Sequence, residues 1–214
     1  MFVDREDAGR QLAGALARIA LVRPVVLGLP RGGVPVAAVV ARALGAPLDV
    51  ILVRKVGAPG QPELAAGAVG EDDVFVGNED VIRGARIDGA QLRKLAERER
   101  SILNARAATI RAVRSPEPIR ERTVVVVDDG IATGASASAA CRVATARGAA
   151  QVVVAAPVSS SEAAGQLLET ADKVVCVLTP PPGGFGSVGR YYADFSPVSD
   201  EEVLRLLREG QRKE

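Results

Sequence analysis

Two adjacent carboxylates, Asp128 and Asp129, follow a run of four valines and precede a turn of small residues. Carboxylates at such a place can accept hydrogen bonds from neighbouring sugar hydroxyls or hold a magnesium ion through water. Small side chains let backbone N–H groups approach a phosphate, and the turn adds two hydroxyls. The turn consists of Ala132, Thr133, Gly134, Ala135 and Ser136. An acid pair beside such a turn predicts a sugar-phosphate site.

A second candidate for anion binding is the loop formed by Arg31, Gly32 and Gly33, between a short apolar run (25–29) and a segment rich in alanine and valine (34–44). Glycine allows close backbone approach, and the guanidinium of arginine offers a planar fork to phosphate oxygens. As a bare motif, Arg-Gly-Gly is more often an ordinary turn. Its place between a predicted strand and a predicted helix is what favours phosphate binding here.

Arg54 and Lys55 are a third candidate for anion binding. They lie near the end of a strand predicted over residues 48–56. The next residues, 57–63, contain two glycines and two prolines, which predicts an irregular segment. The alternative is that both cations are ordinary surface charges beside a turn.

The aromatic residues are concentrated near the C-terminal end. Four of the six Phe and Tyr residues fall between Phe185 and Phe195, in a segment rich in glycine and proline. Such rings can stack on a planar base. They can equally form a small satellite core or a contact between subunits.

The elements that must position these residues alternate along the chain. Apolar runs predict strands at 25–29, 48–56, 123–127, 151–156 and 173–179, with helices between them and a final helix from residue 200. An opening helix is expected at 4–20, short strands around 65–76, and a long helix at 88–113 whose apolar stripe is interrupted by Glu99 and Arg106. This alternation predicts an α/β fold with a doubly wound, mostly parallel sheet, in one domain (1–214) with a small appendage. Ligands of such sheets bind at the carboxyl ends of the strands, where the acid pair falls.

Composition narrows the classes of function. Lys and Arg total 27 against 26 Asp and Glu, and this balance argues against a dedicated nucleic-acid binder. The chain has no histidine, which excludes His-based triads and most catalytic zinc sites. No apolar run is long enough for a membrane span, so we expect a cytoplasmic protein. Cys141 and Cys176 are expected to be buried free thiols rather than a disulfide.

The order of the apolar run, the two acids and Thr-Gly-Ala-Ser resembles the signature of the type I phosphoribosyltransferases for 5-phosphoribosyl-1-pyrophosphate (PRPP). With the flanking elements, residues 25–195 resemble a bacterial subgroup that carries Asp-Asp-Gly-Ile-Ala-Thr-Gly. The resemblance implies that Asp128 and Asp129 hold the ribose hydroxyls, directly or through Mg²⁺, and that residues 132–136 hold the 5′-phosphate. It places pyrophosphate on Arg31 to Gly33 and the leaving charge on Arg54 or Lys55.

The resemblance also implies a flexible active-site loop at 57–63 and a small hood at 180–196, with Phe185 against the base. The expected activity is pentosyl transfer in nucleotide metabolism. The 5-phosphoribosyl group would move from PRPP to a nucleobase or related nitrogen nucleophile, with release of pyrophosphate. Dimers are common in the family, so a homodimer is a possible assembly. Ala132 stands where 6-oxopurine enzymes carry an acid, which disfavours hypoxanthine and guanine, and Gly130 stands where the family usually has an apolar side chain.

Two alternatives remain at this stage. The same fold can serve as a non-catalytic regulatory protein that binds PRPP or a nucleotide. A phosphatase-like enzyme could instead use Asp128 as its nucleophile, although the small turn fits a stationary phosphate better.

Overall fold

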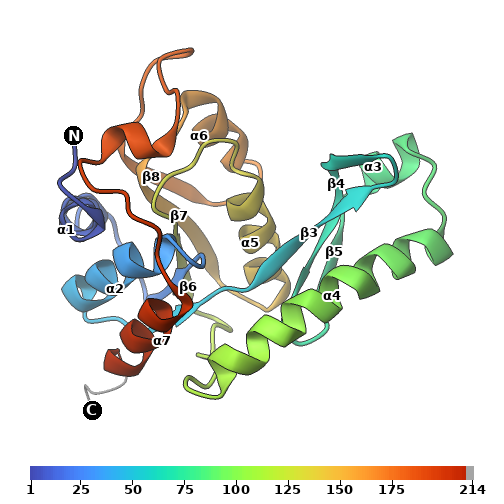
Figure 1. Cartoon of the computed structure of the whole chain (residues 1–214), viewed down its shortest axis with the longest axis horizontal. Helices are drawn as coiled ribbons and strands as arrows, with labels where there is room; N and C mark the ends of the chain where they lie inside the picture. Colours follow the sequence, from blue (N-terminus) through green and yellow to red (C-terminus); the bar gives the residue numbers. More distant parts are fainter. Residues whose placement is uncertain (211–214) are drawn as a thin grey trace.

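The computed structural model describes residues 1–210, including every side chain in that range except that of Glu63. Its centre is a parallel sheet of five strands in the order β2-β1-β6-β7-β8 (Figure 1). The strands are β1 (Val25–Gly28), β2 (Leu48–Val50), β6 (Thr123–Val127), β7 (Gln151–Val158) and β8 (Lys173–Leu178). The predicted α/β class and parallel sheet are confirmed.

Helices cover both faces of this sheet. One face packs against α1 (Arg5–Leu16), α2 (Gly33–Leu44) and α7 (Asp200–Glu209), and the other against α5 (Ala135–Ala146) and α6 (Ser161–Leu167). The valines of β6 alternate between the two cores: Val125 and Val127 face the first, and Val124 and Val126 face the second. All four are fully buried, because a central parallel strand has no solvent face.

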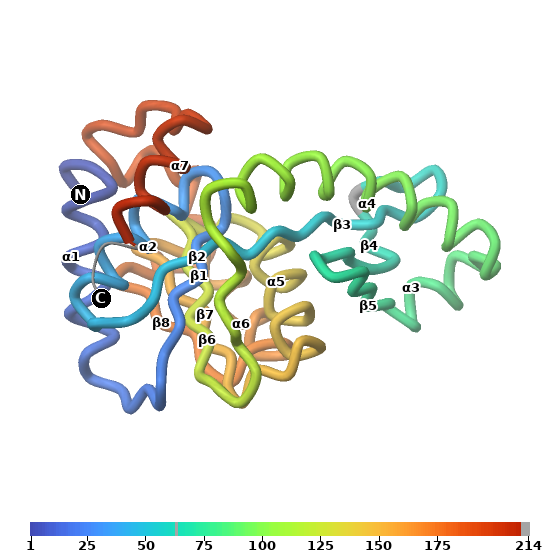
Figure 2. The backbone as a smooth tube through the Cα atoms, turned by 90° about the horizontal axis from the view of Figure 1, so that it is seen from below, coloured from blue at the N-terminus to red at the C-terminus, as the bar shows by residue number. Residues whose placement is uncertain are grey.

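The second part of the fold is an arm formed by residues 53–111, which projects from this body (Figures 1 and 2). It contains an antiparallel sheet of β3 (Val53–Ala58), β4 (Gln61–Gly70) and β5 (Phe75–Gly77), with α3 (Glu79–Gly84) and α4 (Gly89–Arg111). A capping box at Asp88 starts α4, at the first residue of the predicted helix. Ala96, Leu103 and Ile110 of α4 join the same core as α1 and α2, so the arm is packed onto the body.

Two predictions about the arm are wrong. Residues 48–56 do not form one strand, since Leu48–Val50 pairs with β1 in the body while Val53–Ala58 pairs with β4 in the arm. Residues 57–63 form the tip of the β3–β4 hairpin rather than a loop without regular structure, although the strand register shifts within them. Gly60 supplies the positive φ (+72°) of this turn. The register shifts beside Gly57, where an added Cβ would lie 2.6 Å from the Pro62 carbonyl oxygen.

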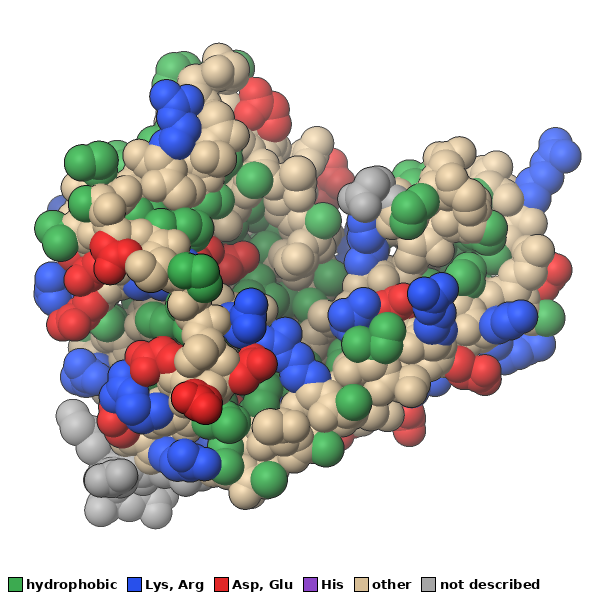
Figure 3. Space-filling view, in the orientation of Figure 1, with side chains coloured by type: hydrophobic (Ala, Val, Ile, Leu, Met, Phe, Trp, Pro, Cys, Tyr) green, Lys and Arg blue, Asp and Glu red, His purple; other side chains and the backbone are tan. Residues whose placement is uncertain are grey.

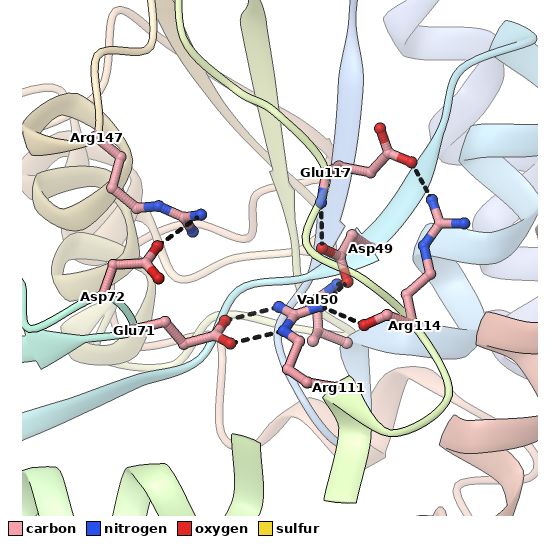
Figure 4. A network of polar contacts seen from close by, with 8 residues as sticks. All are labelled: Asp49, Val50, Glu71, Asp72, Arg111, Arg114, Glu117 and Arg147. Atoms are coloured by element: carbon pink, nitrogen blue, oxygen red, sulfur yellow. Dashed lines mark hydrogen bonds and ion pairs between the residues drawn. The ribbon is translucent and has the colours of Figure 1, made fainter. Parts of the chain in front are cut away.

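Buried charges join the arm to the body (Figure 4). Arg111, at the end of α4, donates to both carboxylate oxygens of Glu71 at 2.6 and 2.7 Å and to Asp49 Oδ1 at 2.7 Å. The other Asp49 oxygen accepts from the backbone N–H of Glu117 at 3.0 Å. Burial disfavours the charged guanidinium, but the bonds with Glu71 and the charge of Asp49 prevail and raise the pKa of Arg111. We refer to Asp49, Glu71, Arg111 and Glu117 as the joint.

Other expectations concern cysteines and membranes. Both thiols are free: Cys141 is buried, as predicted, whereas Cys176 is only half-buried. Burial raises the pKa of Cys141 to about 12 and that of Cys176 to about 11, so both stay protonated at neutral pH. Within residues 1–210, no helix has the length and apolar character that crossing a membrane requires.

Candidate active site

The candidate site lies in a hollow between body and arm, where lysine and arginine side chains gather (Figure 3). Two adjoining cavities of about 520 and 500 Å³, which share Val53, Arg54 and Ser136, form this cleft. The first is lined by Leu29, Pro30, Arg31, Ile51, Leu52, Val53, Arg54, Ile102, Leu103, Arg106, Asp128, Ser136 and Asp200. Its floor is the carboxyl edge of the parallel sheet, where ligands of such sheets bind.

Asp128 and Asp129 follow β6 directly, but they face different surroundings. Asp128 lines the first cavity, and its Oδ1 accepts from the backbone N–H of Asp129 at 2.9 Å. Asp129 Oδ2 is paired instead with Arg5 of α1 at 2.9 Å. Burial, then repulsion from Asp129, raises the pKa of Asp128 to about 8. Burial also raises the pKa of Asp129, against the opposing effect of Arg5.

The loop of Arg31, Gly32 and Gly33 touches the acid pair. An added Cβ on Gly32 would lie 2.0 Å from Asp129 Oδ2, and one on Gly33 would lie 2.5 Å from the Val127 carbonyl oxygen. Both positions therefore exclude any side chain. The peptide bond between Pro30 and Arg31 is cis, and the exposed Arg31 side chain lines the first cavity. The structure thus brings this loop and Asp128 to one surface.

The turn at 132–136 leads into α5. Gly134, at φ +73°, precedes the helix without a side-chain cap, so the first N–H groups of α5 have no capping oxygen. Ser160 Oγ donates to the Ala132 carbonyl at 2.8 Å, which anchors the start of the turn to α6. Ser136 lines both cavities. An uncapped helix start beside a hydroxyl is suited to an anion.

The arm supplies the other side of the cleft. Arg54 lines both cavities and pairs with Glu99 at 2.7 Å, while Lys55 lines the second. Arg106 lines the first cavity and lies 3.5 Å from Asp200 of α7. Of the two charges on the apolar stripe of α4, Glu99 is thus paired within the arm, and Arg106 is paired with the body.

Residues 5–195 match the family model described as the phosphoribosyl transferase domain. The chain belongs to this family. A Mycobacterium tuberculosis protein named "putative phosphoribosyl transferase" is 50% identical over 212 residues, 99% of this chain and 47% of the relative. The chain therefore spans about half the length of the curated relatives it matches. The family and these relatives support a transferase.

Solved structures share the fold of this chain. The crystal structure of TT1426 from Thermus thermophilus is 50% identical, has a TM-score of 0.92, and is matched over 97% of this chain and 98% of that one. A hypothetical protein from Neisseria gonorrhoeae, solved with bound ppGpp, shares the fold at 15% identity and a TM-score of 0.51, over 99% of this chain and 97% of that one.

Phe185 does not line the cleft of this phosphoribosyl transferase domain. It is 8% exposed and belongs to an aromatic cluster that contains Phe2 and Tyr192, with Tyr191 and Phe195 against it. Its ring centre lies 5.6 Å from that of Tyr191. This placement corresponds to the satellite core that the sequence left as an alternative to base stacking.

Sequence reasoning missed the role of two segments around the acid pair. Val188, in the short 3₁₀ helix η1 (Val188–Tyr191), takes the space beside Gly130: an added Cβ there would lie 2.2 Å from Val188 Cγ1. This valine fills the space that a side chain at position 130 would need. The Tyr192 hydroxyl donates to the Asp129 carbonyl at 2.5 Å. One feature of the sequence indicated that Arg106 is a site residue, namely its position on the apolar stripe of α4. No such indication existed for Arg5.

Proposed function

We propose that this chain is a PRPP-dependent phosphoribosyltransferase that moves the 5-phosphoribosyl group to a nucleobase or related nitrogen nucleophile and releases pyrophosphate. One observation carries the proposal: Asp128 and Ser136, from the connection between β6 and α5, and Arg31, from the connection between β1 and α2, line a single cavity at the carboxyl edge of the sheet. A ribose that carries a phosphate at one end and a pyrophosphate at the other needs an acid and two anion-binding groups around it.

In this proposal the turn at 132–136 holds the 5′-phosphate through the first N–H groups of α5 and the hydroxyls of Thr133 and Ser136. Asp128 accepts hydrogen bonds from the ribose hydroxyls. Arg31 and the backbone of Gly32 and Gly33 bind pyrophosphate. Arg54 and Lys55 approach from the arm and compensate the charge that develops on the leaving group.

The residues of the chain position and neutralise rather than form covalent bonds. As the bond from ribose C1 to pyrophosphate lengthens, positive charge grows on the sugar and negative charge grows on the departing oxygen. The fixed carboxylate of Asp128 lies on the sugar side, and the arginines lie on the pyrophosphate side. The acceptor nitrogen then forms the new bond to C1, and its proton leaves to solvent. Holding the reactants in line contributes a large part of such rate enhancements.

Magnesium fits this donor set as a partner of the substrate. Among the described residues, no cluster of three or more acidic, His or Cys side chains could hold an ion by itself. Mg²⁺ commonly uses one or two carboxylates together with substrate phosphates, which matches Asp128 beside a pyrophosphate site. When bound, the ion would neutralise phosphate charge. The sequence analysis predicted that both Asp128 and Asp129 would bind the magnesium ion.

Several finer points belong to the same proposal. We infer that residues 1–214 act as one phosphoribosyltransferase-like domain with 180–196 as its hood. We also infer that the protein acts in the cytoplasm, and a homodimer is compatible with the proposal. Because Phe185 is buried, base recognition by the hood would use its backbone or neighbouring groups. Ala132 is exposed and provides no acid for a purine nitrogen, which favours acceptors other than hypoxanthine and guanine.

The test is calorimetric titration with PRPP, with and without Mg²⁺, followed by assay of pyrophosphate release in pools of candidate bases. Mg²⁺-dependent binding with base-dependent release is the expected result. Asp128→Asn should abolish binding, whereas Asp80→Asn, which removes an exposed charge paired with Arg83 on α3, should leave it unchanged. Binding without release in any pool would support the regulatory protein instead. No binding at all would refute the proposal.

A further inference from the structure

The first residue of α1 reaches the candidate site from far away in the sequence. Asp4 caps this helix, and the Arg5 side chain extends from its first turn to the acid pair. Arg5 Nε and Nη2 both lie 2.9 Å from Asp129 Oδ2. The Arg5 side chain is 12% exposed and that of Asp129 is 14% exposed, so this pair is much drier than an ordinary surface ion pair.

Other contacts fix the guanidinium of Arg5 independently of the acid. Its Nη1 donates to the Ser196 carbonyl at 2.8 Å, and its central carbon lies 4.1 Å from the centre of the Phe195 ring. An arginine held by a carbonyl, an aromatic face and a carboxylate has little rotamer freedom left to lose. Arg5 therefore acts as a fixed element of the fold to which Asp129 is attached.

Asp129 is in turn confined on its remaining sides. Its Oδ2 lies only 2.0 Å from the position that a Cβ on Gly32 would take. The carboxylate is therefore held between Arg5 and the Gly32 backbone. Its carbonyl accepts from the Tyr192 hydroxyl. Asp128 is among the residues that line the cleft, and Asp129 is not.

We propose that Arg5 is a positioning residue that turns Asp129 away from the cleft and uses its carboxylate as the wall of the Arg31–Gly33 loop, leaving Asp128 as the acid that faces substrate. This inference rests on the proposed function, because it assigns the two acids different duties in PRPP binding. Asp128 contacts the ribose directly. Asp129 acts on pyrophosphate only through the backbone that it supports.

The experiment measures PRPP affinity by calorimetry and kcat and KM by pyrophosphate release, for wild type, Arg5→Gln, Arg5→Lys, Asp129→Asn and the double variant Arg5→Gln/Asp129→Asn. Arg5→Gln should weaken PRPP binding on the order of 100-fold, the scale expected when a loop that positions substrate is misplaced. The loss should appear mainly in KM, since Arg5 touches no reacting atom. Arg5→Lys keeps the charge but loses the fork, and should restore part of the affinity.

The double variant separates positioning from a general loss of structure. If Arg5 acts through Asp129, the double variant binds PRPP no more weakly than the poorer single variant. Arg10→Gln is the matched control: it lies on the same helix and pairs with Glu6 on the surface, at 57% and 66% exposure, and should bind as wild type does.

Each outcome separates this inference from the proposed function. Wild type that fails to bind PRPP refutes the proposed function. Wild type that binds, with Arg5→Gln within about twofold of it, overturns the positioning role alone. Additive losses in the double variant, or Arg5→Lys equal to wild type, overturn it as well. If Arg5→Gln does not fold, the other two single variants still test the positioning role. The role requires that Arg5→Lys binds PRPP with an affinity below that of wild type and that Asp129→Asn also binds more weakly than wild type.

Discussion

The contact between Gly130 and Val188 offers a direct test of how the C-terminal segment supports the acid pair. A Cβ on Gly130 would lie 2.2, 2.8 and 3.0 Å from Val188 Cγ1, Cγ2 and Cβ. All three neighbours belong to one side chain, so Gly130→Ala forces Val188 aside rather than the backbone. Overpacking of this kind costs about 1 to 3 kcal/mol of stability. We expect a loss near 2 kcal/mol, and weaker PRPP binding because the acid loop shifts.

The rescue variant makes this expectation sharper. Val188→Ala removes the two atoms closest to the new Cβ and should cost about 1 kcal/mol alone, since the side chain is only half-buried. In Gly130→Ala/Val188→Ala the added methyl occupies the vacated space. The double variant should therefore be at least about 1 kcal/mol more stable than the sum of the single losses predicts.

Urea denaturation of the four proteins gives this coupling energy, and PRPP titration shows whether the site recovers with it. Gly165→Ala is the control, because its Cβ meets nothing within 4 Å on an exposed turn of α6. It should stabilise the protein by about 0.5 to 1 kcal/mol. A neutral Gly130→Ala, or strictly additive losses in the double variant, would refute the reasoning.

Three further predictions concern charge and capping. Because the pKa of Asp128 rises from 3.8 to about 8 on folding, the folded state holds a proton that the unfolded state releases, and wild-type stability falls as pH rises through that window. Asp128→Asn should therefore gain stability over wild type between pH 4 and 8 in urea denaturation, and a constant difference would contradict the shift. Glu71→Met leaves the buried Arg111 with one carboxylate at the joint and should cost about 3 to 5 kcal/mol, whereas a loss under 1 kcal/mol would show that Asp49 suffices. Asp88→Ala removes the cap of α4 and should lower the free energy of unfolding by about 1 kcal/mol in thermal unfolding. The steepness of the unfolding transition should stay unchanged.

The parallel body was predictable because its signals are local. Buried runs such as residues 123–127 have one stable environment, a strand covered on both faces, and the predicted strand has the same bounds as β6. The caps at Asp4 and Asp88 likewise depend on neighbours within one turn. The arm was harder. Glycine and proline at 57–63 favour a break in regular structure, but a hairpin tip needs the same residues, and only the partner strand distinguishes the two.

The site divides in the same way. Sequence order placed Asp128 and Ser136 at one sheet edge, because the end of a strand and the start of its helix are close in both sequence and space. No such rule pairs Arg5 with Asp129, which is 124 positions away and contacts it only through tertiary packing. Adjacent letters also made Asp128 and Asp129 look equivalent. Tertiary contacts separate them, since Asp128 lines the cleft whereas Asp129 is paired with Arg5.

The joint also bears on how this architecture can change. The chain leaves the body just after Asp49 and returns at Arg111 and Glu117, and these residues are bonded to one another, so the exit and the return of the arm are held at one point. The segment between them also contacts the body elsewhere, through the ion pairs Arg106–Asp200 and Arg147–Asp72 and through the residues of α4 that join the common core. None of the five strands of the parallel sheet lies within residues 53–111. Exchange of residues 53–111 between relatives, with Asp49, Glu71, Arg111 and Glu117 kept, would alter one wall of the cleft and leave the strand ends on its floor in place.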